Sequence, residues 1–157
     1  MSRKSKLIRK VVVLDKKFSN ALVHRTINKI MFNGKKTVAE RIVYGAIELA
    51  SKKLNKDPLD VFQTAIKNVS PAIQLKGRRM GGSNFQIPTE VSDDRKIILA
   101  LQWIISSARR RKGMPMNEKL ATELMDAYNN TGGAIKKKEE THRMAEANRA
   151  FAHFARF

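Results

Sequence analysis

Cysteine is absent from this chain of 157 residues, and histidine is scarce. Without cysteine the chain can form no disulfide, no thiolate zinc site and no cysteine nucleophile, and the composition suits a reducing compartment. The three histidines, His24, His142 and His153, do not form the i, i+4 pair of a zinc-binding helix. The sequence therefore predicts no bound metal and no other cofactor.

Acidic residues are also few, with 14 Asp and Glu against 32 Lys and Arg. The acids are scattered, mostly beside cations or at expected helix starts, so no two of them stand out as a general acid and base. The segment Asn33-Gly34-Lys35-Lys36-Thr37 has lysine where a phosphate-binding loop needs Ser or Thr, and a helix is expected before it instead of a strand. We therefore expect no enzymatic activity.

Long hydrophobic runs are missing as well. The stretch Ile97–Leu101 is far shorter than the roughly 20 apolar residues that a membrane-spanning helix needs. The basic start MSRKSKLIRKVVVL lacks the longer apolar region and the cleavage site of a secretory signal. We expect no membrane segment, and we interpret residues 1–14 as a basic arm that stays on the mature protein.

What the chain has in excess is positive charge, with a formal net charge of +18 and an isoelectric point near 10.6. The cations are clustered: eleven lie in residues 1–36 against the single acid Asp15, and others gather at residues 76–79, 109–112 and 136–138. A compact monomer with this charge repels itself unless a polyanion neutralises it. The clusters favour a nucleic-acid-binding protein over one whose charged faces are merely solvated.

Helix predominates in the sequence pattern. Apolar residues recur at helical spacing in six segments, residues 19–32, 37–50, 58–69, 93–112, 116–128 and 134–154. Thr37 and Glu40 predict a capping box at the start of the second segment. Asp57 before Pro58 predicts the start of the third, and Ser92 is expected to cap the fourth.

The pattern changes between the third and fourth segments. Apolar residues there recur with a period of two in each arm around a double glycine: Ile73, Leu75, Phe85, Ile87 and Val91. This is typical of a β-hairpin, here with a loop at residues 80–84 that contains Gly81-Gly82. Along the first strand, Arg79 shares the face of Leu75 and Arg78 points to the opposite face.

The expected fold is therefore mainly α. We predict a single RNA-binding domain over residues 1–157, with about six helices and a protruding β-hairpin at residues 72–91, between the third and fourth helices. The basic arm at residues 1–14 precedes the helices. A C-terminal helix and tail occupy residues 134–157.

Four consecutive cations, Arg109 to Lys112, stand where the fourth helix is expected to end. One or two of them would complement the helix dipole, at about 0.3–1 kcal/mol each. Four in a row repel one another, so we interpret the run as phosphate-contacting. Trp103 and Phe85 have rings able to stack on bases, but Trp103 belongs to an apolar stripe and is assigned to the core.

Three long motifs, in this order and spacing, resemble the bacterial-type small-subunit ribosomal protein of the S7 family. They are INKIMFNGKKTVAERIVYGA (27–46), RRMGGSNFQIPTEV (78–91) and KKKEETHRMAEANRAFAHF (136–154). The resemblance implies a helical domain with a protruding hairpin. It also implies a structural constituent of the small ribosomal subunit, which binds ribosomal RNA as a primary binder and nucleates assembly of the head, or 3′ major, domain.

The resemblance further implies where the protein works. The hairpin and adjoining helices of the family lie near the exit-site tRNA and the messenger RNA, and neighbouring proteins of the head and platform are expected partners. The expected location is the ribosome of a bacterial cytoplasm, with a plastid-encoded product as the other option. RNA contacts are expected from Arg3, Lys4, Lys6, Arg9, Lys10, Arg25, Asn28, Lys29, Gly34, Lys35, Lys36, Arg41, Lys76, Arg78, Arg79, Gly81, Gly82, Arg95, Arg109, Arg110, Arg111, Lys112, Lys136, Lys137, Lys138, His142 and Arg143.

Two other function classes compete with this interpretation. A helical DNA- or RNA-binding regulator that acts off the ribosome should present a recognition helix with base-reading residues between phosphate contacts. The cations here instead occupy arms, loops and helix ends. An RNA-modifying enzyme, the weakest alternative, needs a catalytic constellation or a cofactor loop, which the sequence does not offer.

Overall fold

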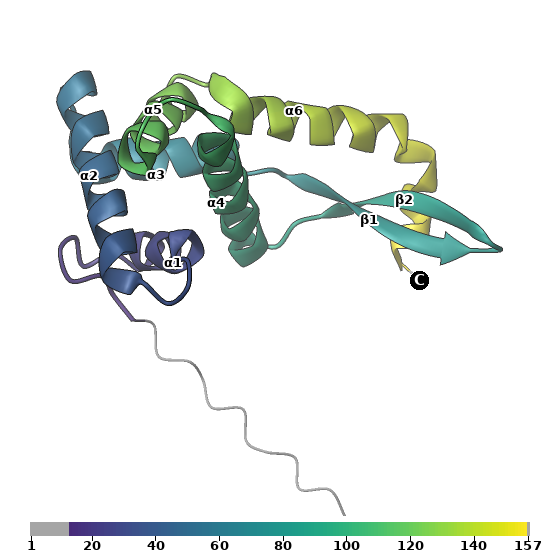
Figure 1. Ribbon diagram of the computed structural model, residues 1–157. Helices are drawn as coiled ribbons and strands as arrows, with labels where there is room; N and C mark the ends of the chain where they lie inside the picture. The colour runs from purple at the N-terminus through teal and green to yellow at the C-terminus, as the bar shows by residue number, and fades with distance from the viewer. Residues whose placement is uncertain (1–12, 157) are drawn as a thin grey trace, which may run out of the picture.

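A computed structural model describes residues 13–156. The fold is mainly helical, with a two-stranded antiparallel hairpin between the third and fourth helices, as the sequence predicted (Figure 1). The elements in chain order are α1 (Ala21–Ile30), α2 (Lys36–Leu54), α3 (Pro58–Val69), β1 (Ile73–Met80), β2 (Ser83–Glu90), α4 (Asp93–Arg110), α5 (Met116–Tyr128), α6 (Gly132–Ala147) and a 3₁₀ helix, η1 (Arg149–Arg156). The basic arm lies almost entirely outside the described residues.

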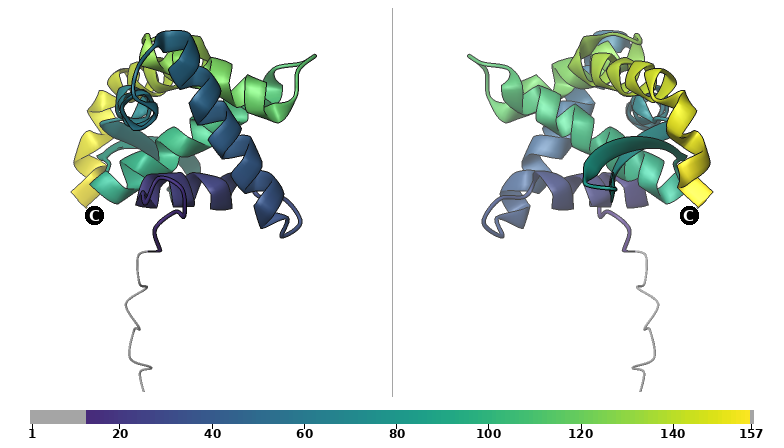
Figure 2. Two further views of the ribbon diagram at one scale, coloured as in Figure 1. Left: turned by 90° about the vertical axis from the view of Figure 1, so that its left-hand side faces the viewer. Right: turned by 90° about the vertical axis from the view of Figure 1, so that its right-hand side faces the viewer.

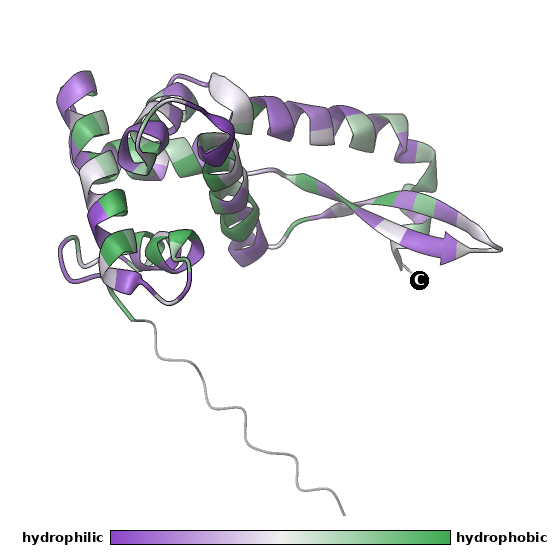
Figure 3. Ribbon diagram, in the orientation of Figure 1, coloured by the Kyte–Doolittle hydropathy of each residue, from purple (hydrophilic) through white to green (hydrophobic). Residues whose placement is uncertain are grey.

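The apolar faces of α1 to α6 meet in one core. Helix α5 contacts α2, α3, α4 and α6, and these helices pack around it (Figure 2). Phe62, Ile47 and Leu101 are among the largest side chains that are fully buried there. Trp103 packs against the edge of this core, where the sequence placed it. Hydrophilic residues cover much of α6 and of the hairpin's outer half (Figure 3).

The helix starts agree with the sequence in part. Asp57 caps α3, and its Oδ2 accepts the backbone N–H groups of Leu59 at 3.0 Å and Asp60 at 3.1 Å. The capping box predicted at Thr37 is wrong, because α2 already begins at Lys36 and its cap residue makes no side-chain capping bond. The preceding turn supplies a backbone bond instead, from the Lys36 N–H to the Gly34 carbonyl at 2.8 Å. Ser92 is the N-cap residue of α4, but its side chain makes no capping bond either.

The segment before α1 is held to α2 by one buried acid. Asp15 accepts the backbone N–H groups of Lys17 and Phe18, and the Tyr44 hydroxyl donates to its other oxygen. Burial and the hydrogen bond to Asp15 raise the pKa of Tyr44 to about 12. The single acid of the basic N-terminal region therefore has a structural role.

The hairpin turns more tightly than the sequence suggested. Met80 pairs with Ser83, so Gly81 and Gly82 alone form the turn, with φ of 55° and 88°. Positive φ at both central residues defines a type I′ turn, whose twist matches that of the two strands. Glycine adopts positive φ with little steric strain. The loop of residues 80–84 expected from the sequence is therefore a two-residue turn.

This turn sets the faces of the hairpin. Leu75 pairs with Pro88, and Arg78 pairs with Phe85, and paired residues share a face of the ribbon. Side chains alternate between the two faces along each strand, so Ile73 and Leu75 lie on the face opposite Arg78. Phe85 shares the face of Arg78, and Ile73 and Leu75 therefore lie opposite Phe85. Arg78 and Arg79 point to opposite faces, as expected. The ribbon thus presents apolar side chains on both faces, and both faces need cover.

The C-terminal segment provides some of that cover, and here the sequence expectation was wrong. A continuous helix was expected through Phe154, but α6 ends at Ala147, and Asn148 donates its side-chain N–H to the Met144 carbonyl at 2.8 Å. The chain then turns into η1, which packs against β2 (Figure 1). The rings of Phe85 and Phe151 lie 5.2 Å apart, so the break lets η1 fold back onto the hairpin.

Candidate nucleic-acid interface

Cations near both ends of α4 lie close to α1. Arg109, in the last turn of α4, donates from Nη2 to the Ile30 carbonyl at 3.4 Å. Burial lowers the pKa of Lys29, and the positive charge of nearby Arg95 lowers it further. Neighbouring like charges repel one another, and a bound phosphate would relieve that repulsion. The structure thus brings together residues that lie far apart in the sequence.

The turn between α1 and α2 continues this surface. Asn33 and Gly34 both have positive φ, 50° and 74°, and the Lys35 N–H donates to the Phe32 carbonyl at 3.1 Å. These are the features of a type I′ turn, for which Asn-Gly is the favoured pair. The turn presents Lys35 and Lys36 to solvent, and a Cβ built on Gly34 would meet no atom within 4 Å.

Other predicted contacts on this side are exposed or already paired. Asn28 and Arg41 are exposed. Arg25 forms an ion pair with Asp94, with 3.1 Å between Nη1 and Oδ1. The pair is largely exposed, so it contributes little to stability and can be exchanged for a phosphate at low cost.

The run Arg109 to Lys112 divides into two parts. Arg109, Arg110 and Lys112 are exposed. Arg111 instead turns inward and donates from Nε and Nη2 to Glu123 Oε2, at 3.0 and 2.6 Å, and it also pairs with Asp126. Burial alone would lower the pKa of Arg111, but the hydrogen bonds to both carboxylates raise it.

Glu123 explains why Arg111 turns inward. This carboxylate is only 1% exposed, and its Oε1 accepts the Ala134 N–H of α6 at 2.9 Å. A buried carboxylate needs a partner for its charge, and Arg111 is that partner. The structure thus gives Arg111 a structural role at the junction of α4, α5 and α6.

The hairpin carries its cations beyond α4, alongside α6 and η1. Lys76, Arg78 and Arg79 are exposed, and Arg78 donates from Nη1 to the Phe154 carbonyl at 3.2 Å. At the tip, a Cβ on Gly81 or Gly82 would meet no atom within 4 Å. Glycine is therefore required here by the positive φ of the turn and not by a close neighbour. The tip is open to an approaching RNA backbone.

Helix α6 mixes exposed cations with residues that hold the fold. Lys136 and Arg143 are exposed, and exposed Lys137 pairs with Glu140, with 2.7 Å between Nζ and Oε2. Lys138 donates to the Asn68 carbonyl at 2.7 Å, which ties α6 to the end of α3.

His142 also holds the fold. Its Nε2 accepts the Ala72 N–H, 3.2 Å away, at the base of the hairpin. Burial and the charge of Lys138 lower its pKa. Both Lys138 and His142 were expected to contact RNA, and the structure gives each a partner within the protein.

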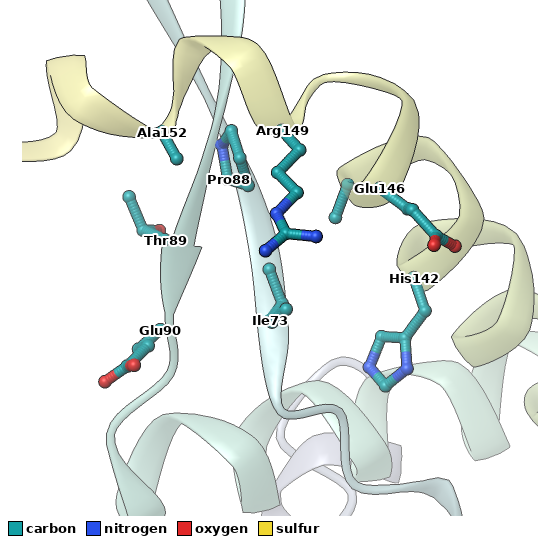
Figure 4. A pocket seen from close by; sticks show the side chains of 9 residues that line it. Ile73, Pro88, Thr89, Glu90, His142, Glu146, Arg149 and Ala152 are labelled. Atoms are coloured by element: carbon teal, nitrogen blue, oxygen red, sulfur yellow. The ribbon is translucent and has the colours of Figure 1, made fainter.

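A hollow of about 550 Å³ is lined by residues of the hairpin, α6 and η1. Figure 4 shows the side chain of Arg149 extending into it, with His142 of α6 at another edge. Sequence reasoning did not single out Arg149, although it lies within the C-terminal motif, and it also passed over Phe32. Phe32 stands directly before the basic turn, which was the available signal.

Comparison with known proteins places the chain in a family. The family model for ribosomal protein S7p/S5e matches residues 2–149. The chain belongs to this family. Its S7 relatives include the small ribosomal subunit protein uS7 of Thermotoga neapolitana, 53% identical over 97% of this chain and 98% of the relative. Those of Herpetosiphon aurantiacus and Chloroflexus aggregans are 50% and 53% identical, over 100% and 99% of both chains.

Residues 13–156 of this S7 family member lack two other kinds of site. No helix there is long and apolar enough to cross a membrane. No group of three or more His, Asp or Glu side chains in the same residues is arranged to hold a metal ion.

Proposed function

We propose that this chain is a structural constituent of the small ribosomal subunit and binds ribosomal RNA directly. Its relatives carry the name small ribosomal subunit protein uS7 at 50–53% identity over nearly their whole length. The S7 family is structural, and the chain is not an enzyme. Within the subunit, the proposed role is primary binding that nucleates the head, or 3′ major, domain.

The observation that carries this proposal is that α4 places Arg95 near Lys29 and Arg109 on the Ile30 carbonyl, close to the exposed Lys35-Lys36 turn. These cations come from α1, α4 and the α1–α2 turn, so only the folded body assembles them. A rigid set of cations can match the phosphates of a folded RNA, whereas a flexible basic tail binds any polyanion.

The proposed contacts follow from exposure and pairing. They keep the half-buried cations of α1, exposed Arg41 of α2, and the exposed cations of the turn, α4, the hairpin and α6, together with the basic arm. They leave out Arg111, Lys138 and His142, whose polar atoms are engaged inside the protein.

The hairpin supports the second part of the proposal, a position near the exit-site tRNA and the messenger RNA. It extends beyond α4, alongside α6 and η1, and carries exposed Lys76, Arg78 and Arg79 (Figure 1). A basic ribbon of this shape can reach a ligand that the helical body does not touch. Proteins of the head and platform are the proposed neighbours, and a bacterial cytoplasmic ribosome is the proposed location, with a plastid ribosome as the alternative.

Filter binding with a fragment of head-domain ribosomal RNA tests the proposal. If the surface neutralises about 6–10 phosphates, affinity should fall roughly 10³–10⁵-fold between 50 and 200 mM monovalent salt. An unrelated RNA of equal length should bind more weakly at every salt concentration. Equal binding of both RNAs, or a flat salt response, would contradict the proposal.

Paired variants locate the surface. Lys35→Ala/Lys36→Ala and Arg109→Ala/Arg110→Ala should each lower the salt slope by about 0.7–0.9 for every phosphate that the variant no longer neutralises. The matched control is Lys52→Ala/Lys53→Ala, which removes two exposed cations at the other end of α2. The control variant should show the same salt dependence of RNA affinity as wild type.

Sedimentation separates this function from that of a regulator acting off the ribosome. A lysate is fractionated at low and at high salt, and the chain is followed by antibody. Migration with small subunits that survives the high-salt wash supports the ribosomal role. A free or DNA-bound pool would favour the regulator.

A further inference from the structure

Phe32 is the most exposed large hydrophobic side chain among those of the described residues, with 75% of its surface accessible. It follows the last residue of α1 by two positions and precedes the Asn33-Gly34 turn. Exposing an aromatic ring to water has no benefit for the free protein, since burial of its surface would be favourable. The ring is thus available to a partner.

The turn fixes where this ring stands. Phe32 and Lys35 are the first and last residues of the turn, joined by the backbone bond of 3.1 Å. The first and last Cα atoms of a β-turn lie within about 7 Å. The turn therefore keeps the backbones of Phe32 and Lys35 close to each other before any ligand binds.

A hollow of about 230 Å³ adjoins the ring. Its apolar lining includes Met31, Val38 and Ile42, and Lys35 stands at its edge. Val38 is 48% exposed, so the apolar surface continues from Phe32 onto the first turn of α2. The site combines a flat apolar ring, an apolar hollow beside it and a lysine that lines this hollow.

The charges decide which occupant this site fits. Lys35, Lys36 and Arg41 are exposed, and Glu40 is the only acid between Asn28 and Ile47. An apolar protein side chain would desolvate these cations without neutralising them. A nucleotide supplies a base for the ring and a phosphate for the lysines, and every base has a face that stacks on an aromatic.

We infer that Phe32 is a stacking platform for an unpaired nucleobase of the bound RNA, with the adjoining phosphates on Lys35 and Lys36. The inference rests on the proposed function, since it names one contact within that RNA-binding surface. Loss of the stacking free energy between a base and the ring should weaken RNA binding roughly 5- to 150-fold.

The test compares two polyanions and four proteins. Wild type, Phe32→Ala, Phe32→Leu and Phe32→Tyr are titrated with the head-domain RNA fragment and with inorganic polyphosphate, which has charge but no bases. Phe32→Ala and Phe32→Leu should lose RNA affinity, Phe32→Tyr should keep it, and all four should bind polyphosphate within about twofold. Circular dichroism melting should be unchanged, because the side chain is exposed.

A fluorescent variant gives a second readout. Phe32→Trp adds an emitter to Trp103, the only tryptophan of the chain, and wild type reports the Trp103 background. The added emission should be quenched by RNA and not by polyphosphate.

Each contrary result has its own meaning. If Phe32→Leu binds RNA as wild type does, or if no Phe32 variant changes RNA affinity, the stacking contact is overturned while RNA binding stands. The same holds if Phe32→Ala binds RNA normally but enters small subunits poorly, which would indicate a protein occupant. If wild type does not prefer head-domain RNA to the unrelated RNA, the proposed function itself fails.

Discussion

Arg111 places its guanidinium on a single carboxylate oxygen of Glu123, with Nε at 3.0 Å and Nη2 at 2.6 Å. The other carboxylate oxygen of Glu123 accepts the Ala134 N–H at the start of α6. One ion pair therefore joins the end of α4, the middle of α5 and the first turn of α6. A residue that resembles a phosphate ligand in the sequence is a structural link in the fold.

Arg111→Ala should destabilise the protein. The change leaves the Glu123 carboxylate buried with no guanidinium, and breaking a fully buried pair costs about 3–5 kcal/mol. Because Arg111 is itself 27% exposed, we expect about 2–4 kcal/mol, measured by urea unfolding. Arg110→Ala is the matched control at the same helix end and should stay within about 0.5 kcal/mol of wild type. Similar effects of the two changes would contradict this role of Arg111.

The hairpin can be shortened without losing its turn or its packing. Deleting Arg79, Met80, Ser83 and Asn84 joins Arg78 to Gly81 and Gly82 to Phe85, and so keeps the observed pairing of Arg78 with Phe85. Melting temperature and head-domain RNA binding should be nearly unchanged. The defect should appear in tRNA release or reading-frame maintenance by ribosomes that carry this variant.

The body variant Arg109→Ala/Arg110→Ala provides the contrast. It should weaken RNA binding and assembly, because it removes two of the proposed phosphate contacts. If the shortened hairpin blocks assembly while the body variant assembles normally, the proposed division between hairpin and body is wrong.

Acidification should loosen the base of the hairpin. The Ala72 N–H donates to Nε2 of His142, so this nitrogen must be unprotonated in the folded state. The folded pKa of His142 is lowered from its ordinary value of 6.5, by burial first and by Lys138 second. Its contribution is therefore complete above about pH 6.5 and is lost as the pH falls through the lowered pKa.

Hydrogen exchange of the Ala72 amide between pH 7.5 and 5 measures this effect, after correction for the intrinsic rate. His142→Gln keeps an acceptor that does not titrate, so its Ala72 protection should vary less with pH. Equal pH dependence in both proteins would show that His142 does not control the contact.

Deletion of residues 2–10 tests the basic arm, which lies outside the described residues. The anchor formed by Asp15 and Tyr44 remains in the shortened chain, so the melting temperature should change little. The deletion removes Arg3, Lys4, Lys6, Arg9 and Lys10. The salt slope of RNA binding should fall by about 0.7–0.9 for each phosphate that these residues neutralise. Marked unfolding after the deletion would show the arm to be structural.

Several elements could be predicted from the sequence because interactions between neighbouring residues determine them. The Asp57-Pro58 start of α3 depends only on neighbouring residues, and so do the bounds of α5 and the reversal at Gly81-Gly82. The break at Asn148 was missed, because the residues after it continue the apolar spacing of a helix. Phe151 satisfies that spacing, but it is stabilised by Phe85 of the hairpin, a contact that helix periodicity cannot show.

By itself the sequence determined the fold class, the excess of positive charge and the family, since these depend on composition, short-range patterns and long motifs. The tertiary structure alone decided which cations face solvent. Arg110 and Arg111 are neighbours in the chain, yet one is exposed and the other is paired with Glu123. A buried carboxylate attracts the nearest guanidinium, and which one is nearest depends on how α4, α5 and α6 pack together.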